Sequence, residues 1–327
     1  MKIAVIGGGS WATAIVKILT ENNDYVGWWM RNEEAVDHIK KFHHNPHYLS
    51  SVELMTEKID VSTNLDHVVS EADYVIFAVP SAFLKNALES LTIDLSTKTV
   101  FSAIKGIVPD ENVIVGEFFH QKYNVPMENI GVITGPCHAE EVALERLSYL
   151  TIAGLDDEKV DTLARHMESD FIKTKKTDDI IGTEYAAVLK NIYALAAGIY
   201  HGLGYGDNFQ AVLVSNAIRE MKKFIKAVYP LKRDINESAY LGDLLVTAYS
   251  QFSRNRMFGN MIGKGYTIRS AKLELNMVAE GYYAAALIHE VAKAKGVKMP
   301  IAHAVYKILY KDKSPKKTMG KLTDKLN

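Results

Sequence analysis

Residues 2–14 read KIAVIGGGSWATA and decide the fold of this chain, because they join a strand, a glycine turn and a helix start. The run KIAVIG (2–7) is short, apolar and β-branched, which is typical of a strand buried on both faces of a parallel sheet. The turn that follows matches G-x-G-x-x-A, a spacing that lets the pyrophosphate of a dinucleotide approach the backbone. A purely structural strand-to-helix turn is the competing interpretation. We expect a dinucleotide cofactor to contact Gly7, Gly9, Ser10, Trp11 and Ala12.

Strands and helices alternate after this turn as far as about residue 180. The expected helices are 10–21 and 33–41, and the expected strands are 24–30, 72–80, 99–106, 129–136 and 149–154. This alternation predicts a parallel sheet with right-handed crossovers. Helical spacing then dominates in 183–201, 208–229, 237–250, 268–274 and 279–295. The predicted fold class is α/β, a Rossmann-type doubly wound parallel sheet followed by an all-helical C-terminal domain.

The length of 327 residues fits two domains, and the change of pattern divides the chain into 1–181 and 182–327. The first would bind the dinucleotide, and the second would hold substrate and catalytic groups. The tail KDKSPKKTMGKLTDKLN (311–327) is basic and poor in apolar residues. We expect it to be a frayed or loosely attached end.

The composition excludes several classes of protein. Hydrophobic residues make up 48% and the net charge is −1, without the basic excess of a binder of nucleic acid or anionic membranes. Cys137 is the one cysteine, which rules out an internal disulfide and fits a reducing cytoplasm. The N-terminus lacks the plan of a signal peptide, and no span of about 20 residues is apolar throughout. We expect a cytoplasmic protein without nucleic-acid partner or membrane insertion. The oligomeric state stays open, with a homodimer as one option.

The residues after the second expected strand bear on which dinucleotide binds. NAD-selective sites commonly place Asp or Glu about 20 residues after the glycines, where the carboxylate binds the ribose 2′-hydroxyl. This chain has Arg31 in that region, and a guanidinium can pair with a 2′-phosphate. NADPH is therefore favoured, with NADH use still open. The competing interpretation leaves Arg31 in solvent and lets Glu33 or Glu34 reach the ribose.

A second set of motifs surrounds a lysine in an apolar segment. The stretch AAVLKNIYALAAGIYH (186–201) carries Lys190 and Asn191 near its centre. A lone lysine on an amphipathic helix usually extends its ammonium group to solvent. This one lies near the predicted domain junction, where ligand sites commonly form, so we expect its side chain to be held in a cleft. Three more polar clusters occur at 105–106, 135–140 and 241–259.

Together these motifs resemble the NAD(P)-dependent glycerol-3-phosphate dehydrogenases, chiefly the bacterial type. The matching residues are GGGSWATA (7–14), AVPS (78–81), KG (105–106), GPCHAEE (135–141), LKN (189–191), LGDLLVT (241–247), SRNRMFG (253–259) and VAEG (278–281). They follow the family's order over nearly the whole chain, to about residue 310. The resemblance implies reduction of dihydroxyacetone phosphate to sn-glycerol 3-phosphate, which feeds glycerophospholipid synthesis.

The resemblance and the chemistry of ketone reduction imply a role for each motif. Lys190 would give a proton to the developing alkoxide and would take it back in the reverse oxidation. Asp243 would orient Lys190 or bind a substrate hydroxyl, and Lys105 would add a second cation near the carbonyl. If the two lysines lie close together, their repulsion and burial would lower the pKa of both. Arg254 would bind the substrate phosphate through two hydrogen bonds. Substrate contacts are expected at Lys105, Gly135, Cys137, Lys190, Asn191, Asp243, Thr247, Ser253, Arg254 and Asn255. Further cofactor contacts are expected at Arg31, Lys105, Ala139, Arg254, Val278 and Glu280.

Other functions fit the sequence less well. A catalytic thiol at Cys137 is not expected, because ketone reduction needs no covalent intermediate; the family usually has Ser or Thr there, and an aromatic residue in place of His138. The histidines of FHHNPHYL (42–49) lack neighbouring carboxylates or cysteines, so no metal is expected. The alternative enzyme is a two-domain β-hydroxyacid dehydrogenase acting on a carboxylate. The alternative without catalysis is a protein that senses NADPH.

Overall fold

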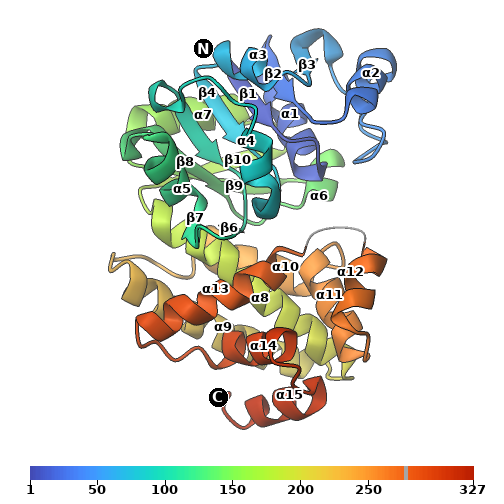
Figure 1. Ribbon diagram of the computed structural model, residues 1–327, viewed down its shortest axis with the longest axis vertical. Coiled ribbons are helices and arrows are strands. Elements are labelled where there is room, and N and C mark those ends of the chain that lie inside the picture. The colour runs from blue at the N-terminus through green and yellow to red at the C-terminus, as the bar shows by residue number, and fades with distance from the viewer. Residues whose placement is uncertain (276–278) are drawn as a thin grey trace. The chain divides into compact units, whose positions relative to one another are not determined.

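The computed structural model describes residues 1–275 and 279–327 and contains two compact units (Figure 1). The first consists of residues 1–104 and 108–180, and the second of residues 105–107 and 181–327. Residues 105–107, which the sequence analysis assigned to the N-terminal domain, therefore group with the C-terminal unit.

An eight-stranded sheet forms the centre of the first unit, in the order β10-β9-β8-β5-β4-β1-β2-β3. Neighbours from β8 to β3 pair in parallel, as expected of a doubly wound sheet. One departure is that β9 runs antiparallel to β8, while β10 pairs parallel with β9. The strands are β1 Ile3–Ile6, β2 Val26–Trp29, β3 Ile59–Ser62, β4 Tyr74–Phe77, β5 Thr99–Ser102, β8 Ile130–Thr134, β9 Ser148–Gly154 and β10 Ile172–Thr177. A separate two-stranded ribbon pairs β6 Ile107–Val108 with β7 Val113–Ile114.

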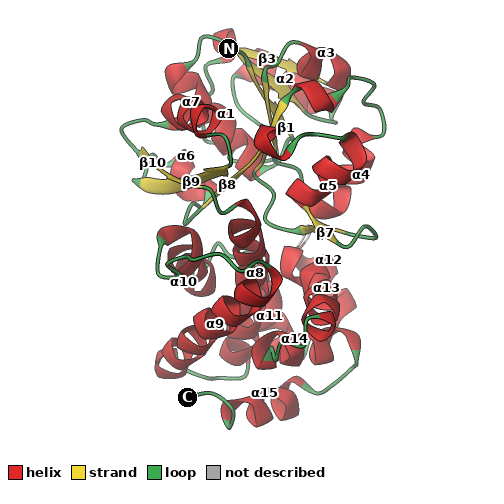
Figure 2. Ribbon diagram, turned by 90° about the vertical axis from the view of Figure 1, so that its left-hand side faces the viewer, coloured by secondary structure: helices red, strands yellow, loops and turns green. Residues whose placement is uncertain are grey.

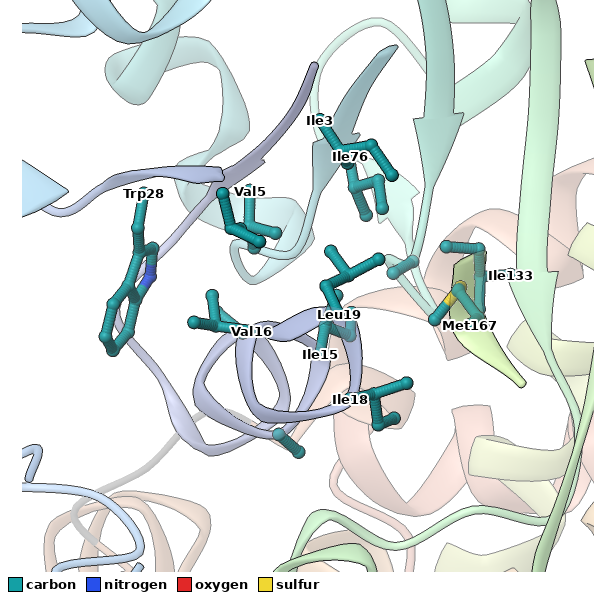
Figure 3. Packing of buried hydrophobic residues seen from close by; sticks show 14 of the residues in the cluster. Ile3, Val5, Ile15, Val16, Ile18, Leu19, Trp28, Ile76, Ile133 and Met167 are labelled. Atoms are coloured by element: carbon teal, nitrogen blue, oxygen red, sulfur yellow. The ribbon is translucent and has the colours of Figure 1, made fainter. Parts of the chain in front are cut away.

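Alternate side chains of each buried strand enter separate hydrophobic cores on the two faces of the sheet. Ile3 and Val5 of β1 lie in one core, and Ala4 and Ile6 lie in the other. Figure 3 shows the first core, where Ile15, Ile18 and Leu19 of α1 pack near the sheet. The helices that supply this core are α1 Ser10–Asn22, α2 Glu33–Phe42, α6 Ala139–Ala143 and α7 Asp157–Met167. The helices that supply the other core are α3 Leu65–Ser70, α4 Leu84–Leu88 and α5 Val115–Tyr123.

From residue 181 onward, the described part of the chain consists of helices joined by loops and turns, without a strand (Figure 2). They are α8 Ile180–Gly202, α9 Asp207–Val228, α10 Asp243–Tyr249, α11 Arg254–Gly263, α12 Ile268–Leu275, α13 Glu280–Ala294, α14 Pro300–Tyr310 and α15 Pro315–Thr323. Among the described residues, no helix combines the length and apolar character that crossing a membrane requires.

The expectation of a loosely attached tail is wrong. The tail folds into α15, whose Met319 and Leu322 are buried, and the Tyr200 hydroxyl donates to the Met319 carbonyl at 3.0 Å. Ser314 caps the helix, since its hydroxyl accepts a hydrogen bond from the Lys317 N–H. A few apolar residues at helical spacing are enough to dock this basic segment on its own unit.

Candidate active site

The glycine turn in the first unit has the shape that a dinucleotide phosphate requires. Gly7 adopts a φ of +140°, and a Cβ there would lie 2.7 Å from the Ala78 carbonyl oxygen, so another residue would clash. Gly9 precedes α1, and a Cβ built on it meets no atom within 4 Å. Ala12 is fully buried in the core beneath the helix. Open space at Gly9 and the start of a 13-residue helix fit a phosphate group.

Two more predicted cofactor contacts, Ser10 and Trp11, lie in the first turn of α1 and are at least partly buried in the protein. Ser10 is buried, and Trp11 is half-buried against the core of the first unit. Arg31 lies exposed just after β2, and the Asn32 side chain caps α2 by accepting a hydrogen bond from the Ala35 N–H. Glu33 and Glu34, the alternative ribose ligands, are exposed in the first turn of α2.

The segment after β8 carries three more of the predicted contacts in the first unit. Gly135 has a φ of +111°, and a Cβ there would lie 2.8 Å from the Tyr149 carbonyl oxygen. Cys137 and Ala139 are both buried, and Ala139 begins α6. The tight approach at Gly135 fixes the path of the chain as it leaves the sheet.

Three charged side chains meet in the interior of the second unit. Lys190 in the middle of α8 is 4% exposed, and its ammonium group forms an ion pair with the Oδ1 atom of Asp243. The Lys105 Nζ atom lies 3.5 Å from the other carboxylate oxygen of Asp243. Asp243 is 1% exposed and begins α10, directly after a π-helical turn, Ser238–Gly242. Such turns are frequent at functional sites.

Burial dominates the acidity of Lys190. The pKa of Lys190 is lowered from 10.5 to about 7, chiefly by burial; the Asp243 carboxylate opposes this effect, and the charge of Lys105 adds to it. Because Lys190 is buried, the alternative of an ammonium group extended to solvent is wrong. A lysine with a pKa near neutrality can both hold and release a proton at physiological pH.

A chain of side-chain amides links four segments around this cluster. The Asn191 side chain donates to the Lys105 carbonyl oxygen at 2.7 Å and accepts from the Asn255 Nδ2 atom at 3.0 Å. The Asn255 Oδ1 atom accepts the Gly281 N–H at 2.9 Å. Each amide nitrogen has two N–H groups, and these bonds use one of each. The amides therefore fix the local backbone, and among the described residues the second N–H group of each remains available to a ligand.

Arg254 stands at the start of α11, next to its capping residue. The Ser253 side chain caps α11 by accepting the Arg256 N–H, and Arg254 is partly exposed in the first turn. The N-terminus of a helix and a guanidinium both favour an anion. Thr247, another predicted substrate contact, is buried and donates its hydroxyl to the Asp243 carbonyl at 2.6 Å.

Four glycines bring α8 and α11 into backbone contact. A Cβ on Gly198 would lie 2.0 Å from the Arg256 carbonyl oxygen, and one on Gly259 would lie 2.2 Å from that of Leu195. Gly202 and Gly263 are equally restricted by the opposite helix. This close approach fixes Lys190 on α8 relative to the start of α11.

Glu280 and Val278 are the last two predicted cofactor contacts. Glu280 begins α13 and is partly buried, beside Gly281 of the amide chain. Val278 lies outside the described residues. Among the residues that are described, no three histidine, cysteine or acidic side chains are grouped to hold a metal.

Asn45, which lies among the histidines of FHHNPHYL, was not predicted to have a role. Asn45 is 1% exposed, and its Nδ2 atom donates to the Gly8 carbonyl at 3.1 Å. Asparagine followed by proline is a common turn signal, which could have marked this residue.

Comparisons with known proteins agree on one family. Family models for the N-terminus and the C-terminus of NAD-dependent glycerol-3-phosphate dehydrogenase match residues 2–160 and 179–320. A glycerol-3-phosphate dehydrogenase [NAD(P)+] from an Exiguobacterium species is 37% identical over 322 residues, 98% of this chain and 94% of the relative. The solved structure of a glycerol-3-phosphate dehydrogenase from Coxiella burnetii superposes with a TM-score of 0.90 at 26% identity, covering 98% of each chain. A D-mandelate dehydrogenase, at 16% identity and a TM-score of 0.63, shares the fold alone.

Proposed function

The chain belongs to the NAD-dependent glycerol-3-phosphate dehydrogenase family, and we propose that it reduces dihydroxyacetone phosphate to sn-glycerol 3-phosphate. It is an NAD(P)-dependent oxidoreductase, and its product supplies glycerophospholipid synthesis. The observation that carries the chemical part of the proposal is the buried cluster of Lys190, Asp243 and Lys105. It provides an acid of nearly neutral pKa beside a second cation, as reduction of a ketone requires.

Lys190 is the proposed proton donor. When bound, the reduced nicotinamide supplies a hydride to the ketone carbon. The negative charge that develops on the ketone oxygen is stabilised by the Lys190 ammonium group, which then transfers a proton to it. In the reverse direction neutral Lys190 removes the proton from the hydroxyl group. Asp243 holds Lys190 in place through its ion pair.

Lys105 and Arg254 are the proposed ligands for the charged parts of the substrate. Lys105 is 19% exposed at its side chain, so its ammonium group can reach a ligand while it stays close to Asp243. Arg254 presents a planar donor group at the start of α11, suited to the phosphate. Asn191, Asn255, Thr247 and Ser253 complete the proposed substrate contacts, together with Gly135 and Cys137.

The proposed cofactor site begins at the glycine turn. Gly7, Gly9, Ser10, Trp11 and Ala12 form its core, and Ala139, Lys105, Arg254, Glu280 and Val278 are further proposed contacts. Arg31 supports a preference for NADPH, since its guanidinium is exposed just after β2. The neighbouring Glu33 and Glu34 would repel a 2′-phosphate and so oppose this preference.

The proposed cellular setting rests on the composition of the chain. A single cysteine, Cys137, fits a reducing compartment, so we place the enzyme in the cytoplasm. The homodimer considered from the sequence is retained as a proposal, and sedimentation of the purified protein tests it.

The test is a substrate panel with purified protein, in which oxidation of NADPH and NADH is followed by absorbance. Dihydroxyacetone phosphate should be reduced, and dihydroxyacetone without its phosphate should be reduced far more slowly. Equal rates for the two would contradict the proposal. Faster turnover of 3-oxo acids would instead identify the alternative, a dehydrogenase of β-hydroxyacids.

A further inference from the structure

Side chains outside the G-x-G-x-x-A motif hold the carbonyl groups of the glycine turn. The indole Nε1 atom of Trp28 donates to the Gly7 carbonyl oxygen at 2.7 Å. The Asn45 Nδ2 atom donates to the Gly8 carbonyl oxygen at 3.1 Å. The next carbonyl, that of Gly9, accepts from both the N–H and the hydroxyl of Thr13 at 3.0 Å. Three successive carbonyl groups therefore each have a fixed partner.

Fixing a carbonyl group also fixes the N–H group of the next residue. In a trans peptide unit these two groups lie in one plane and point in opposite directions. Trp28 thereby orients the Gly8 N–H, and Asn45 orients the Gly9 N–H. Over residues 1–275 and 279–327, neither of these two N–H groups donates to another protein atom.

We propose that Trp28 and Asn45 are positioning residues that aim the Gly8 and Gly9 N–H groups at the pyrophosphate of the nicotinamide dinucleotide. The inference rests on the proposed cofactor and adds the residues that prepare its site. A turn held in its binding conformation loses little freedom when the ligand arrives, so the prepared turn binds more tightly.

Both residues are held too firmly to adopt other positions easily. Trp28 is fully buried and lies near Val5 and Val16 in the core beneath α1 (Figure 3). The Asn45 amide has several partners, because its Oδ1 atom accepts the N–H groups of His47 and Tyr48, and its Nδ2 atom also donates to the Thr13 hydroxyl. Buried polar groups with complete hydrogen bonding are rigid.

The chain offers a matched control beside each residue. Trp29, next to Trp28 in β2, also donates its indole N–H to a carbonyl, but to that of Thr63, outside the turn. Asn64 likewise accepts a backbone N–H, that of His67, and caps α3, outside the glycine turn. Comparing Trp28→Phe with Trp29→Phe, and Asn45→Ser with Asn64→Ser, separates the effect on the turn from the general cost of each substitution.

The experiment measures the Kd of NADPH by titration calorimetry and kcat with saturating NADPH and dihydroxyacetone phosphate. Losing one hydrogen bond should raise the Kd about 5- to 15-fold for Trp28→Phe and for Asn45→Ser. Both control variants should bind as the unaltered protein does, and kcat should change less than about twofold in all four, since the bound cofactor restores the turn. Urea unfolding without NADPH confirms that each variant is folded. If Trp28→Phe is too unstable to measure, Asn45→Ser, which changes a residue in a loop, tests the inference alone.

Two results would overturn the inference. One is a Kd for NADPH that is the same in the folded Trp28→Phe or Asn45→Ser protein as in its control. The other is an unchanged Kd with a reduced kcat, which would place these residues in catalysis. Failure of the unaltered protein to bind NADPH or NADH is a separate outcome, which would overturn the proposed function itself.

Discussion

At the scale of the residue, the pKa of Lys190 sets the pH dependence of both directions of the reaction. Reduction needs protonated Lys190, and the pKa of this residue is about 7. We expect kcat/KM for dihydroxyacetone phosphate to fall about tenfold per pH unit above this value, and kcat/KM for sn-glycerol 3-phosphate to rise through it. Initial rates between pH 6.5 and 9 check this, a range over most of which the substrate phosphate, whose second pKa is about 6, is already a dianion. A flat profile for reduction would remove Lys190 from its role.

Substituting Lys190 tests the same role without changing pH. Lys190→Met should lower kcat about 10²- to 10⁴-fold, the usual contribution of a general acid. Lys226→Met removes an exposed lysine from α9 and should leave kcat unchanged. Turnover of the Lys190 variant at the rate of this control would contradict the proposal.

Arg31 governs the proposed choice between the two cofactors. Arg31→Ala removes a cation that can pair with the 2′-phosphate, so the ratio of kcat/KM for NADPH to that for NADH should fall about 10- to 100-fold. NADH kinetics should change little. A fall for both cofactors alike would show that Arg31 does not discriminate between them.

The sequence predicts the role of a single residue where the chemistry depends on the type of that one side chain. The sequence predicts that Lys190, Asp243 and Lys105 act at one site, and the structure brings them together. The bonds of Trp28 and Asn45 to the glycine turn were not foreseen, because each depends on which carbonyl a side chain meets after folding. No spacing rule encodes such a contact.

At the scale of the element, the glycine contact between α8 and α11 supports the catalytic geometry. Gly259→Ala places a methyl group where only 2.2 Å is available to the Leu195 carbonyl, so the two helices must separate. We expect a loss of about 1–3 kcal/mol in the free energy of unfolding, measured with urea, and a lower kcat, because Lys190 moves relative to α11.

Gly320→Ala in α15 is the matched control for this substitution. A Cβ there meets no atom within 4 Å, and alanine favours a helix more than glycine does. The variant should be as stable as the unaltered protein or more stable by up to about 1 kcal/mol, with unchanged kcat. If Gly259→Ala and Gly320→Ala had the same stability and the same kcat, the close approach of α8 and α11 would not be the reason that position 259 requires glycine.

Helices and strands can be predicted from the sequence where their buried faces give a clear pattern of apolar residues. The six strands expected from apolar runs are present, and the missed β3 and β10 are the two edge strands of the sheet. In β10, IKTKKT is rich in lysine and partly exposed, as edge strands often are, so it lacks the apolar signal. The tail was misjudged for a similar reason, since only Met319 and Leu322 of α15 are buried.

At the scale of the whole molecule, the proposal assigns cofactor binding and proton transfer to residues of different units. Gly9 belongs to the first unit, and Lys190 belongs to the second. A ligand that binds only the folded protein stabilises it by about 2.7 kcal/mol at a concentration one hundred times its Kd. Saturating NADPH should therefore raise the Tm of the unaltered protein and of Lys190→Met by the same amount, although the variant turns over poorly.

Gly9→Ala, unlike Lys190→Met, should reduce the rise in Tm that NADPH produces. The φ of −84° at Gly9 accepts alanine, and the added Cβ meets no protein atom within 4 Å, so the Tm without ligand should hardly change. The same Cβ occupies the space that the pyrophosphate needs, so the rise in Tm with NADPH should shrink, while Lys190 stays intact. Thermal unfolding of the three proteins with and without NADPH measures this. A full rise in Gly9→Ala, or none in Lys190→Met, would mean that the cofactor is held by groups other than those of the glycine turn.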